Sequence, residues 1–232
     1  TCALPISEER IMKNLYKSCF SPTGNMRREL FRWINPDQYG NIFNAENDSL
    51  DLSAKRFMAF DFTHIFEDET LAPAVISYIM HRIMSETGDT GVPSLIMIDE
   101  TAPMLKHPMF RDYFIIGLQE GRKKRQAYLC AFQQPNIIDK LGVGEVIRGQ
   151  CQTIIFFRNP QAMPEDYANW NLTQREIEFI FGKSYRDFPY AILLSRPATG
   201  ESVILDVDLS GLGPYLKLYN SGRKNVLLVE EL

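Results

Sequence analysis

Residues 94–100 read SLIMIDE, a run of four apolar residues, 95–98, that ends in the two carboxylates Asp99 and Glu100. A short, continuous apolar run bounded by polar residues is typical of a strand buried on both faces, as in a parallel sheet. In open α/β sheets the functional residues gather at the carboxyl ends of such strands, and Asp99 and Glu100 fall there. The stretch therefore predicts a buried parallel strand that carries an acidic pair. The alternative is a strand that ends in a solvated acidic turn.

Two adjacent acids in this position resemble a Walker B motif, in which one carboxylate holds a Mg²⁺-bound water and the next orients the attacking water. The phosphate-cradling partner motif, G-x-x-x-x-G-K-[ST], is not found in the chain. The Gly-Lys-Ser run at 182–184 has Ile177 where the loop needs glycine, and a predicted helix precedes it. The run at 21–25 has no lysine after Gly24 in the required place. The chain thus carries the second half of a nucleotide site without the first.

Composition sets the broad class of the protein. The 232 residues are 45% hydrophobic and 23% charged, which suits one large globular domain or one domain with a small appendage. A net charge of −4 does not favour nucleic acid as the main partner. No apolar run approaches the ~18 residues that span a bilayer, and no signal peptide is visible. The four cysteines lack metal-ligand spacing, so we expect reduced cysteines of a cytosolic protein.

The pattern of secondary-structure signals changes near residue 53. Residues 1–52 are helical and looped, with a helix expected over 26–34, and predict a small N-terminal helical subdomain. Over 53–232 strands and helices alternate, which predicts a three-layer α/β core with a mainly parallel sheet. Strands are expected at 57–60, 95–98, 128–132, 153–157, 190–194 and 202–207, the last two as a hairpin. Helices are expected at 71–84, 110–122, 143–148 and 173–181, the last with a capping box of Thr173 and Glu176.

Three further features line up with the acidic pair. The basic run at 121–125 closes a predicted helix, either as a last turn that complements the helix dipole or, through Arg122, as an arginine finger for a neighbouring subunit's nucleotide. Gln133 ends the strand at 128–132 and lies beside Glu100 if the two strands are neighbours. There it either senses a γ-phosphate or only caps the strand. The third feature is the Arg-Asn-Pro run at 158–160, after another strand.

Taken in this order over nearly the whole chain, these residues resemble the ATPases of type IV secretion and conjugation machines, the VirB-system/TrbE/CagE family. The segments that resemble family motifs are NAENDSLDL at 44–52, AFDFT at 59–63, YIMHRI at 78–83, DE at 99–100, RKK at 122–124, Gln133, NP at 159–160 and DLSG at 208–211. The chain departs from the family where Thr101-Ala102-Pro103 follow the acids. It also departs around Gln133, which is flanked by Phe132 and Gln134.

The resemblance implies a RecA-like P-loop NTPase core over 53–232 and a helical insertion subdomain over 1–52. It implies that the P-loop lies upstream in a longer protein, as we also expect because the chain does not begin with methionine. ATP and Mg²⁺ are the implied cofactors: Asp99 holds Mg²⁺ through water, Glu100 activates the attacking water and Gln133 senses the γ-phosphate. Arg122 acts on the nucleotide of a neighbouring subunit, and Arg186 matches a family arginine expected near the nucleotide.

The function implied by the resemblance is that of an ATP-hydrolysing motor subunit for type IV secretion or conjugative transfer across the bacterial envelope. The implied partners are other copies in a hexameric ring and further secretion components, including the inner-membrane channel and coupling ATPases. The implied location is cytoplasmic and peripheral at the inner membrane. Without its P-loop, the chain alone is expected to be almost inactive. Two alternatives stay open: a non-hydrolysing structural or docking subunit, and an FtsK/HerA-like DNA translocase, for which nucleic acid would be the partner.

Overall fold

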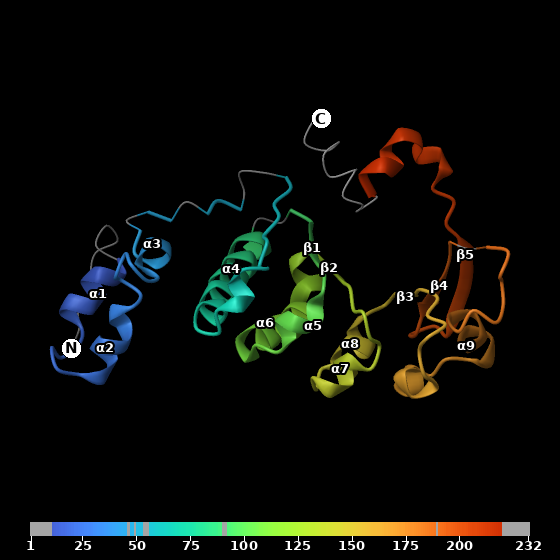
Figure 1. The fold of residues 1–232 in the computed structure, drawn as a ribbon, viewed down its shortest axis with the longest axis horizontal. Helices are drawn as coiled ribbons and strands as arrows, with labels where there is room; N and C mark the ends of the chain where they lie inside the picture. Colours follow the sequence, from blue (N-terminus) through green and yellow to red (C-terminus); the bar gives the residue numbers. More distant parts are fainter. Residues whose placement is uncertain are drawn as a thin grey trace. The chain divides into compact units, whose positions relative to one another are not determined.

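The computed structural model describes residues 11–45, 47–48, 50–52, 56–89, 92–188 and 190–219 (Figure 1). The chain divides into two compact units that alternate along the sequence. The first takes in the residues up to Leu95 together with His107–Tyr113 and Gly121–Ala127. The second takes in Ile96–Lys106, Phe114–Glu120 and the residues from Tyr128 onward. The domain boundary expected after residue 52 stays a prediction.

The first unit is mainly helical. Its elements are α1 (Met12–Ser18), α2 (Asn25–Phe31), α3 (Gly40–Phe43), η2 (Ile65–Glu67), α4 (Leu71–Asp89) and η3 (Gly121–Lys124). The long helix α4 was predicted, and it buries Ala72, Ile76 and Met80, which share one face at i, i+4 and i+8.

The guanidinium of Arg82, on α4, fastens a preceding segment of the chain to this helix. It donates to the Asp48 carboxylate and to the Leu50 carbonyl, and it also pairs with Glu86 one turn along α4. The segment at 44–52 that resembles a family motif is thereby tied to α4. Residues 46 and 49 of that segment lie outside the described residues.

The strand predicted at 57–60 is wrong. These residues form neither helix nor strand, and Phe57 is 79% exposed. At the end of the segment the Asp61 carboxylate accepts hydrogen bonds from the Thr63 backbone N–H at 2.9 Å and from its hydroxyl at 2.6 Å. Such a local turn satisfies polar groups without a neighbouring strand. An apolar run becomes a strand only where another strand offers it a ladder, which the run itself does not encode.

A two-stranded sheet is formed by β1 (Ser94–Ile98) and β2 (Gln126–Cys130). The Ser94 N–H donates to the Arg125 carbonyl and the Ala131 N–H donates to the Ile98 carbonyl, each at 3.0 Å, so the two strands run in the same direction. The predicted strand is thus confirmed.

Burial of β1 on both faces, which we expected from its apolar run, is not found. Leu95 and Met97 are 61% and 63% exposed, whereas Ile98 is buried. On β2, Leu129 is likewise exposed. Because side chains alternate across a strand, this pattern means that the described residues cover only one face of β1. The apolar run predicted the strand but not which of its faces the neighbouring elements cover.

The second unit also holds an antiparallel sheet of β3 (Ile154–Phe156), β4 (Ala191–Arg196) and β5 (Glu201–Asp206), in the order β3-β4-β5. Leu193 of β4 lies opposite Phe156 on one side and Ile204 on the other. The predicted hairpin is confirmed. The mixed α/β class is confirmed as well, but among the described strands only β1 and β2 pair in parallel, so a mainly parallel sheet is not what these residues form. The short turn at 197–200 allows only antiparallel pairing of β4 with β5.

The remaining helices are α5 (Thr101–Leu105), α6 (Pro108–Glu120), α7 (Ile137–Lys140), α8 (Gly144–Gln150), η4 (Pro164–Trp170), α9 (Gln174–Ile180) and η5 (Ser210–Tyr219). The predicted capping box opens α9: the Thr173 N–H donates to Glu176 Oε2 at 2.7 Å and the Glu176 N–H donates to Thr173 Oγ1 at 3.4 Å. None of the described helices has the length and apolar character that crossing a bilayer requires.

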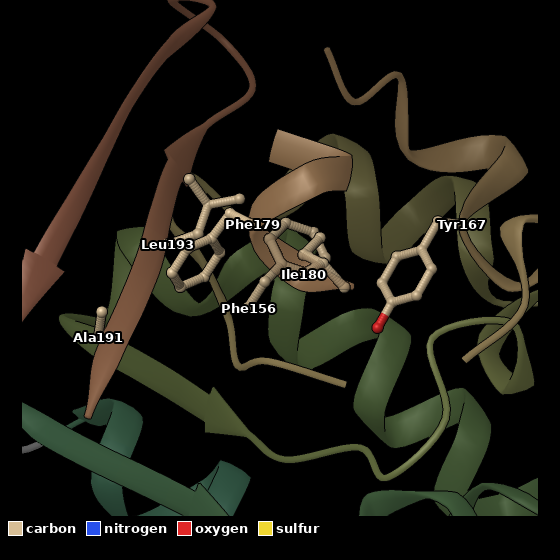
Figure 2. Packing of buried hydrophobic residues seen from close by; sticks show 6 residues of the cluster. All are labelled: Phe156, Tyr167, Phe179, Ile180, Ala191 and Leu193. Carbon is tan, nitrogen blue, oxygen red and sulfur yellow. The ribbon is translucent and has the colours of Figure 1, made fainter. Parts of the chain in front are cut away.

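A cluster of buried side chains joins η4 and α9 to the antiparallel sheet. Its members are Phe156, Tyr167, Phe179, Ile180, Ala191 and Leu193. Figure 2 shows Ala191 and Leu193 along one strand, with Phe179 and Ile180 on the helix beside it. Trp170, at the end of η4, packs edge-on against Phe156 with ring centroids 5.4 Å apart. This core makes η4 a fixed part of the unit.

The cysteines only partly follow the expectation of reduced thiols. Cys130 and Cys151 are free, whereas Cys19 is disulfide-bonded. Disulfide formation depends on how close two Cα atoms come in the fold, which the spacing of cysteines along the sequence does not reveal.

Native Cys130 is expected to resist alkylation by iodoacetamide at pH 8. Burial raises the pKa of its thiol from the ordinary 9.0 to about 12, and Cys151 adds a smaller rise. The reactive thiolate should therefore be about a thousandfold scarcer than in the unfolded chain. Mass spectrometry of the alkylated peptide, with and without urea, gives the two rates.

The raised pKa of Cys130 also makes the stability of the fold depend on pH, with a defined sign. A raised folded-state pKa stabilises the fold at pH values below the unfolded pKa, and this contribution is lost as pH rises from about 9 toward 12. Equal alkylation rates in the native and unfolded protein at pH 8 would show that Cys130 is not buried.

Candidate functional site

The acidic pair lies at the carboxyl end of β1, where the sequence placed it, and both carboxylates are exposed. Glu100 separates β1 from α5 and has left-handed backbone angles, φ 46° and ψ 51°. A residue other than glycine costs about 1–2 kcal/mol in this region. Residues held there by their surroundings cluster at functional sites. The turn after β1 is therefore a strained one that the neighbouring structure must hold.

Thr101 holds this turn. It is fully buried, its backbone N–H donates to the Ala131 carbonyl at 3.1 Å, and its hydroxyl donates to the Ile98 carbonyl at 3.0 Å. One residue thus ties the end of β1 to the end of β2. The sequence singled out Thr101 only as a departure from the family pattern. The signal it offered was a small hydroxyl side chain directly after the acids, where it can bond to the last strand carbonyl.

Gln133 lies beside Glu100. Its amide Nε2 donates to Glu100 Oε1 at 3.0 Å. We expected this proximity if the two strands were neighbours, and the parallel pairing of β1 with β2 supplies that condition. Parallel neighbours end at the same edge of a sheet, so side chains 33 positions apart in the sequence meet there. The roles of the two residues stay predictions.

A cavity of about 200 Å³ adjoins the pair. Its polar lining comes from Glu100, Gln133, Gln134 and Lys106, and its apolar lining from Ala102, Pro103, Ala131, Phe132 and Ile137. Lys106 brings a positive charge to this lining. It was not singled out in the sequence, where it belongs to none of the motifs that were recognised. In this lining the carboxylate and the two amides can hydrogen-bond to a water molecule, and the lysine can attract an anionic group beside that water.

The other predicted site residues do not line this cavity. Asp99 is next to Glu100, and its Oδ1 accepts the Glu100 N–H at 2.9 Å, but it does not line the cavity. Arg186 lies exposed between α9 and β4, where its Nε donates to the Gly182 carbonyl at 3.4 Å. Arg122 lies exposed on η3 in the first unit. The roles expected of these three residues stay predictions.

The carboxylates fit a magnesium ion held largely by water. No group of three or more His, Cys, Asp and Glu residues that could cage a metal occurs in the described part of the chain. Magnesium does not need such a cage, because it usually takes one or two carboxylates and completes its shell with water and phosphate oxygens. The exposed carboxylate of Asp99 is a donor of that kind.

Comparison with known proteins finds relatives of the chain among type IV secretion and conjugal transfer proteins. No family model matches it. It is 27% identical to the type IV secretion system protein VirB4 of Bartonella quintana over 204 residues, which cover 88% of this chain and 25% of the relative. It is 30% identical to CagE of Helicobacter pylori over 195 residues, 82% of this chain and 18% of the relative. The chain is a homologue of the VirB4, TrbE and CagE type IV secretion proteins.

The match to TrbE, a conjugal transfer protein of Rhizobium radiobacter, is 33% identical over 147 residues, 61% of this chain and 17% of the relative. Together the matches confirm the resemblance seen in the sequence. This VirB4/TrbE/CagE homologue spans about a quarter or less of the length of these three relatives.

Proposed function

We propose that this homologue is part of an ATP-hydrolysing motor subunit that energises type IV secretion or conjugative transfer, built on a RecA-like P-loop NTPase core. The observation that carries the proposal is the Glu100–Gln133 hydrogen bond of 3.0 Å at the ends of two adjacent parallel strands. A carboxylate and an amide in this arrangement can orient a water and contact the phosphate that the water attacks. The names of the relatives supply the setting of secretion and conjugal transfer.

Each residue of the site has a proposed part in hydrolysis. Glu100 accepts a hydrogen bond from the attacking water and aligns it. Gln133 bonds to Glu100 when no nucleotide is present and turns its amide to the γ-phosphate when one is bound. Asp99 would hold Mg²⁺ through water, and the ion would supply positive charge that offsets the charge on the phosphate oxygens. Positioning and charge stabilisation account for most of the rate gain in this chemistry.

The remaining parts of the proposal concern the assembly. Arg122 reaches the nucleotide of a neighbouring subunit in a hexameric ring, and Arg186 adds a second positive charge near the phosphates. The phosphate-cradling loop comes from a part of the longer protein outside this chain. The ring works at the cytoplasmic side of the inner membrane, with the channel and coupling ATPases as partners.

The proposal is tested by ATP hydrolysis of the full-length protein over a range of protein concentrations, with and without Arg122→Ala. Activity per subunit is expected to rise with concentration as rings form. An arginine acting in trans contributes about 10³-fold or more, so Arg122→Ala should lower kcat by about that factor. Lys123→Ala is the matched control, because Lys123 is exposed on the same element and its loss should change kcat by less than about threefold.

Two outcomes would contradict this picture. A folded, assembled protein that hydrolyses no ATP at any concentration would favour the structural or docking subunit. Equal losses in Arg122→Ala and Lys123→Ala would assign the effect to the charge of the whole run rather than to one arginine.

A further inference from the structure

The segment that follows Gln133 is fastened to η4 by two consecutive residues. The Asn136 side-chain Nδ2 donates to Asp166 Oδ1 at 2.5 Å, and the indole Nε1 of Trp170 donates to the Pro135 carbonyl at 3.3 Å. Both anchor points lie within three residues of Gln133. They therefore restrict where the backbone that carries Gln133 can move.

A third η4 residue, Asn169, makes a further contact with the chain that follows Gln133. Asn169 Nδ2 donates to Asp139 Oδ2 at 3.1 Å, and Arg148 donates two hydrogen bonds to the same carboxylate at 2.7 and 3.1 Å. The hydrogen bond from Arg148 lowers the pKa of Asp139, so the carboxylate stays charged. The Arg148 guanidinium also lies 5.6 Å from the centre of the Trp170 ring. Asp166 and Asn169 stand at i and i+3, which share one side of a 3₁₀ helix, and Trp170 follows directly at the end of η4.

The η4 element is itself held in place. Asp166 caps its start by accepting the Met163 N–H on Oδ2 at 3.0 Å. Tyr167 is buried in the hydrophobic cluster (Figure 2), and Trp170 packs on Phe156 of β3. The η4 residues that hold the Gln133 segment are thus fixed to the core of the unit by a cap and by packed rings.

We propose that Trp170 and Asp166 are positioning residues for Gln133, which they hold within hydrogen-bond reach of Glu100 by way of Pro135 and Asn136. The inference rests on the proposed function. A misplacement of about 1 Å costs a catalytic group about a hundredfold in rate. Since Gln133 acts on the reacting phosphate rather than on the whole nucleotide, loss of the η4 contacts lowers kcat and leaves KM nearly unchanged.

The test is Trp170→Phe in the full-length protein, which keeps a ring against Phe156 and removes the Nε1–H donor. The expected result is a fall of about tenfold in kcat for ATP hydrolysis with less than a twofold change in KM. In a Gln133→Ala background the same substitution should lower kcat by less than about twofold, because its effect passes through Gln133. Hydrogen exchange at residues 134–138 should become faster in Trp170→Phe.

Two further variants keep the test decisive. Asn136→Ala removes the hydrogen bond to Asp166 and should lower kcat with little change in KM, as Trp170→Phe does. This variant carries the test if the Trp170→Phe protein folds poorly. Ile180→Val trims a fully buried side chain of the same cluster, and it should lower the melting temperature without lowering kcat.

The outcomes separate the two proposals. An equal fold-loss from Trp170→Phe with and without Gln133 would mark a merely structural role and overturn the inference. An active wild type with unchanged kcat in Trp170→Phe and Asn136→Ala would overturn the inference alone. An inactive wild type would contradict the proposed function, and the inference would fall with it.

Discussion

Glu100→Gln is expected to lower kcat for ATP hydrolysis by about 10²–10⁴-fold, the range typical for loss of a group that handles the proton of a reacting water. Glutamine has nearly the same shape, and its carbonyl can still accept the Gln133 amide, so the turn after β1 should keep its structure. ATP affinity should change little, because a residue that acts on the water contributes mainly in the transition state. The full-length protein gives kcat by phosphate release and Kd from a fluorescent nucleotide.

The matched control for this variant is Glu145→Gln, which neutralises an exposed carboxylate in the first turn of α8. Its kcat should stay within about twofold of wild type, since an exposed charge of this kind contributes little. A Glu100→Gln protein that hydrolyses ATP near the wild-type rate would remove Glu100 from catalysis, whatever the structure of its turn.

Gly117→Ala is expected to lower the free energy of unfolding by about 3 kcal/mol, at the upper end of what overpacking costs. In a helix interior alanine is normally more stabilising than glycine by about 1 kcal/mol. The predicted loss of stability in Gly117→Ala therefore has the opposite sign to the effect of helix propensity. A Cβ at position 117 of α6 would lie 2.3 Å from the Tyr128 hydroxyl oxygen and 2.7 Å from its Cζ. The Tyr128 ring packs edge-on to Phe114, which limits its retreat. Urea unfolding measures the change.

The control for helix propensity is Gly149→Ala on α8, where an added Cβ meets no atom within 4 Å. That variant should raise the free energy of unfolding by about 0.5–1 kcal/mol. Tyr128→Phe removes the nearest clashing atom and should partly restore Gly117→Ala. Gly117→Ala as stable as wild type would mean that α6 does not pack on Tyr128 in solution.

The sequence predicted the elements whose causes are local. The apolar face of α4, the capping box of Thr173 and Glu176 and the short turn between β4 and β5 each lie within a few neighbouring residues. They therefore appear in the order of residue types alone. The acidic pair at the end of β1 belongs to the same group, because the strand and the two acids are contiguous in the chain.

The expectations that failed depend on partners far away in the chain. Phe57 lies in an apolar run that lacks a strand to pair with among the described residues, and Met97 lies on a face of β1 that those residues leave uncovered. The proximity of Gln133 to Glu100 was conditional on β1 and β2 being neighbours, and only the fold supplies that condition. The contacts of Trp170 with Pro135 had no counterpart in the sequence pattern, since nothing local links residues 35 positions apart.

Under the proposed role of Glu100, its left-handed turn makes stability and function favour different amino acids at position 100. Backbone conformation alone would favour glycine or asparagine there, and a β-branched residue would fit worst. Selection for stability alone should therefore move position 100 away from glutamate, whereas selection for activity should retain it. If variants selected for stability repeatedly lose Glu100, position 100 is where the protein gives up stability for function.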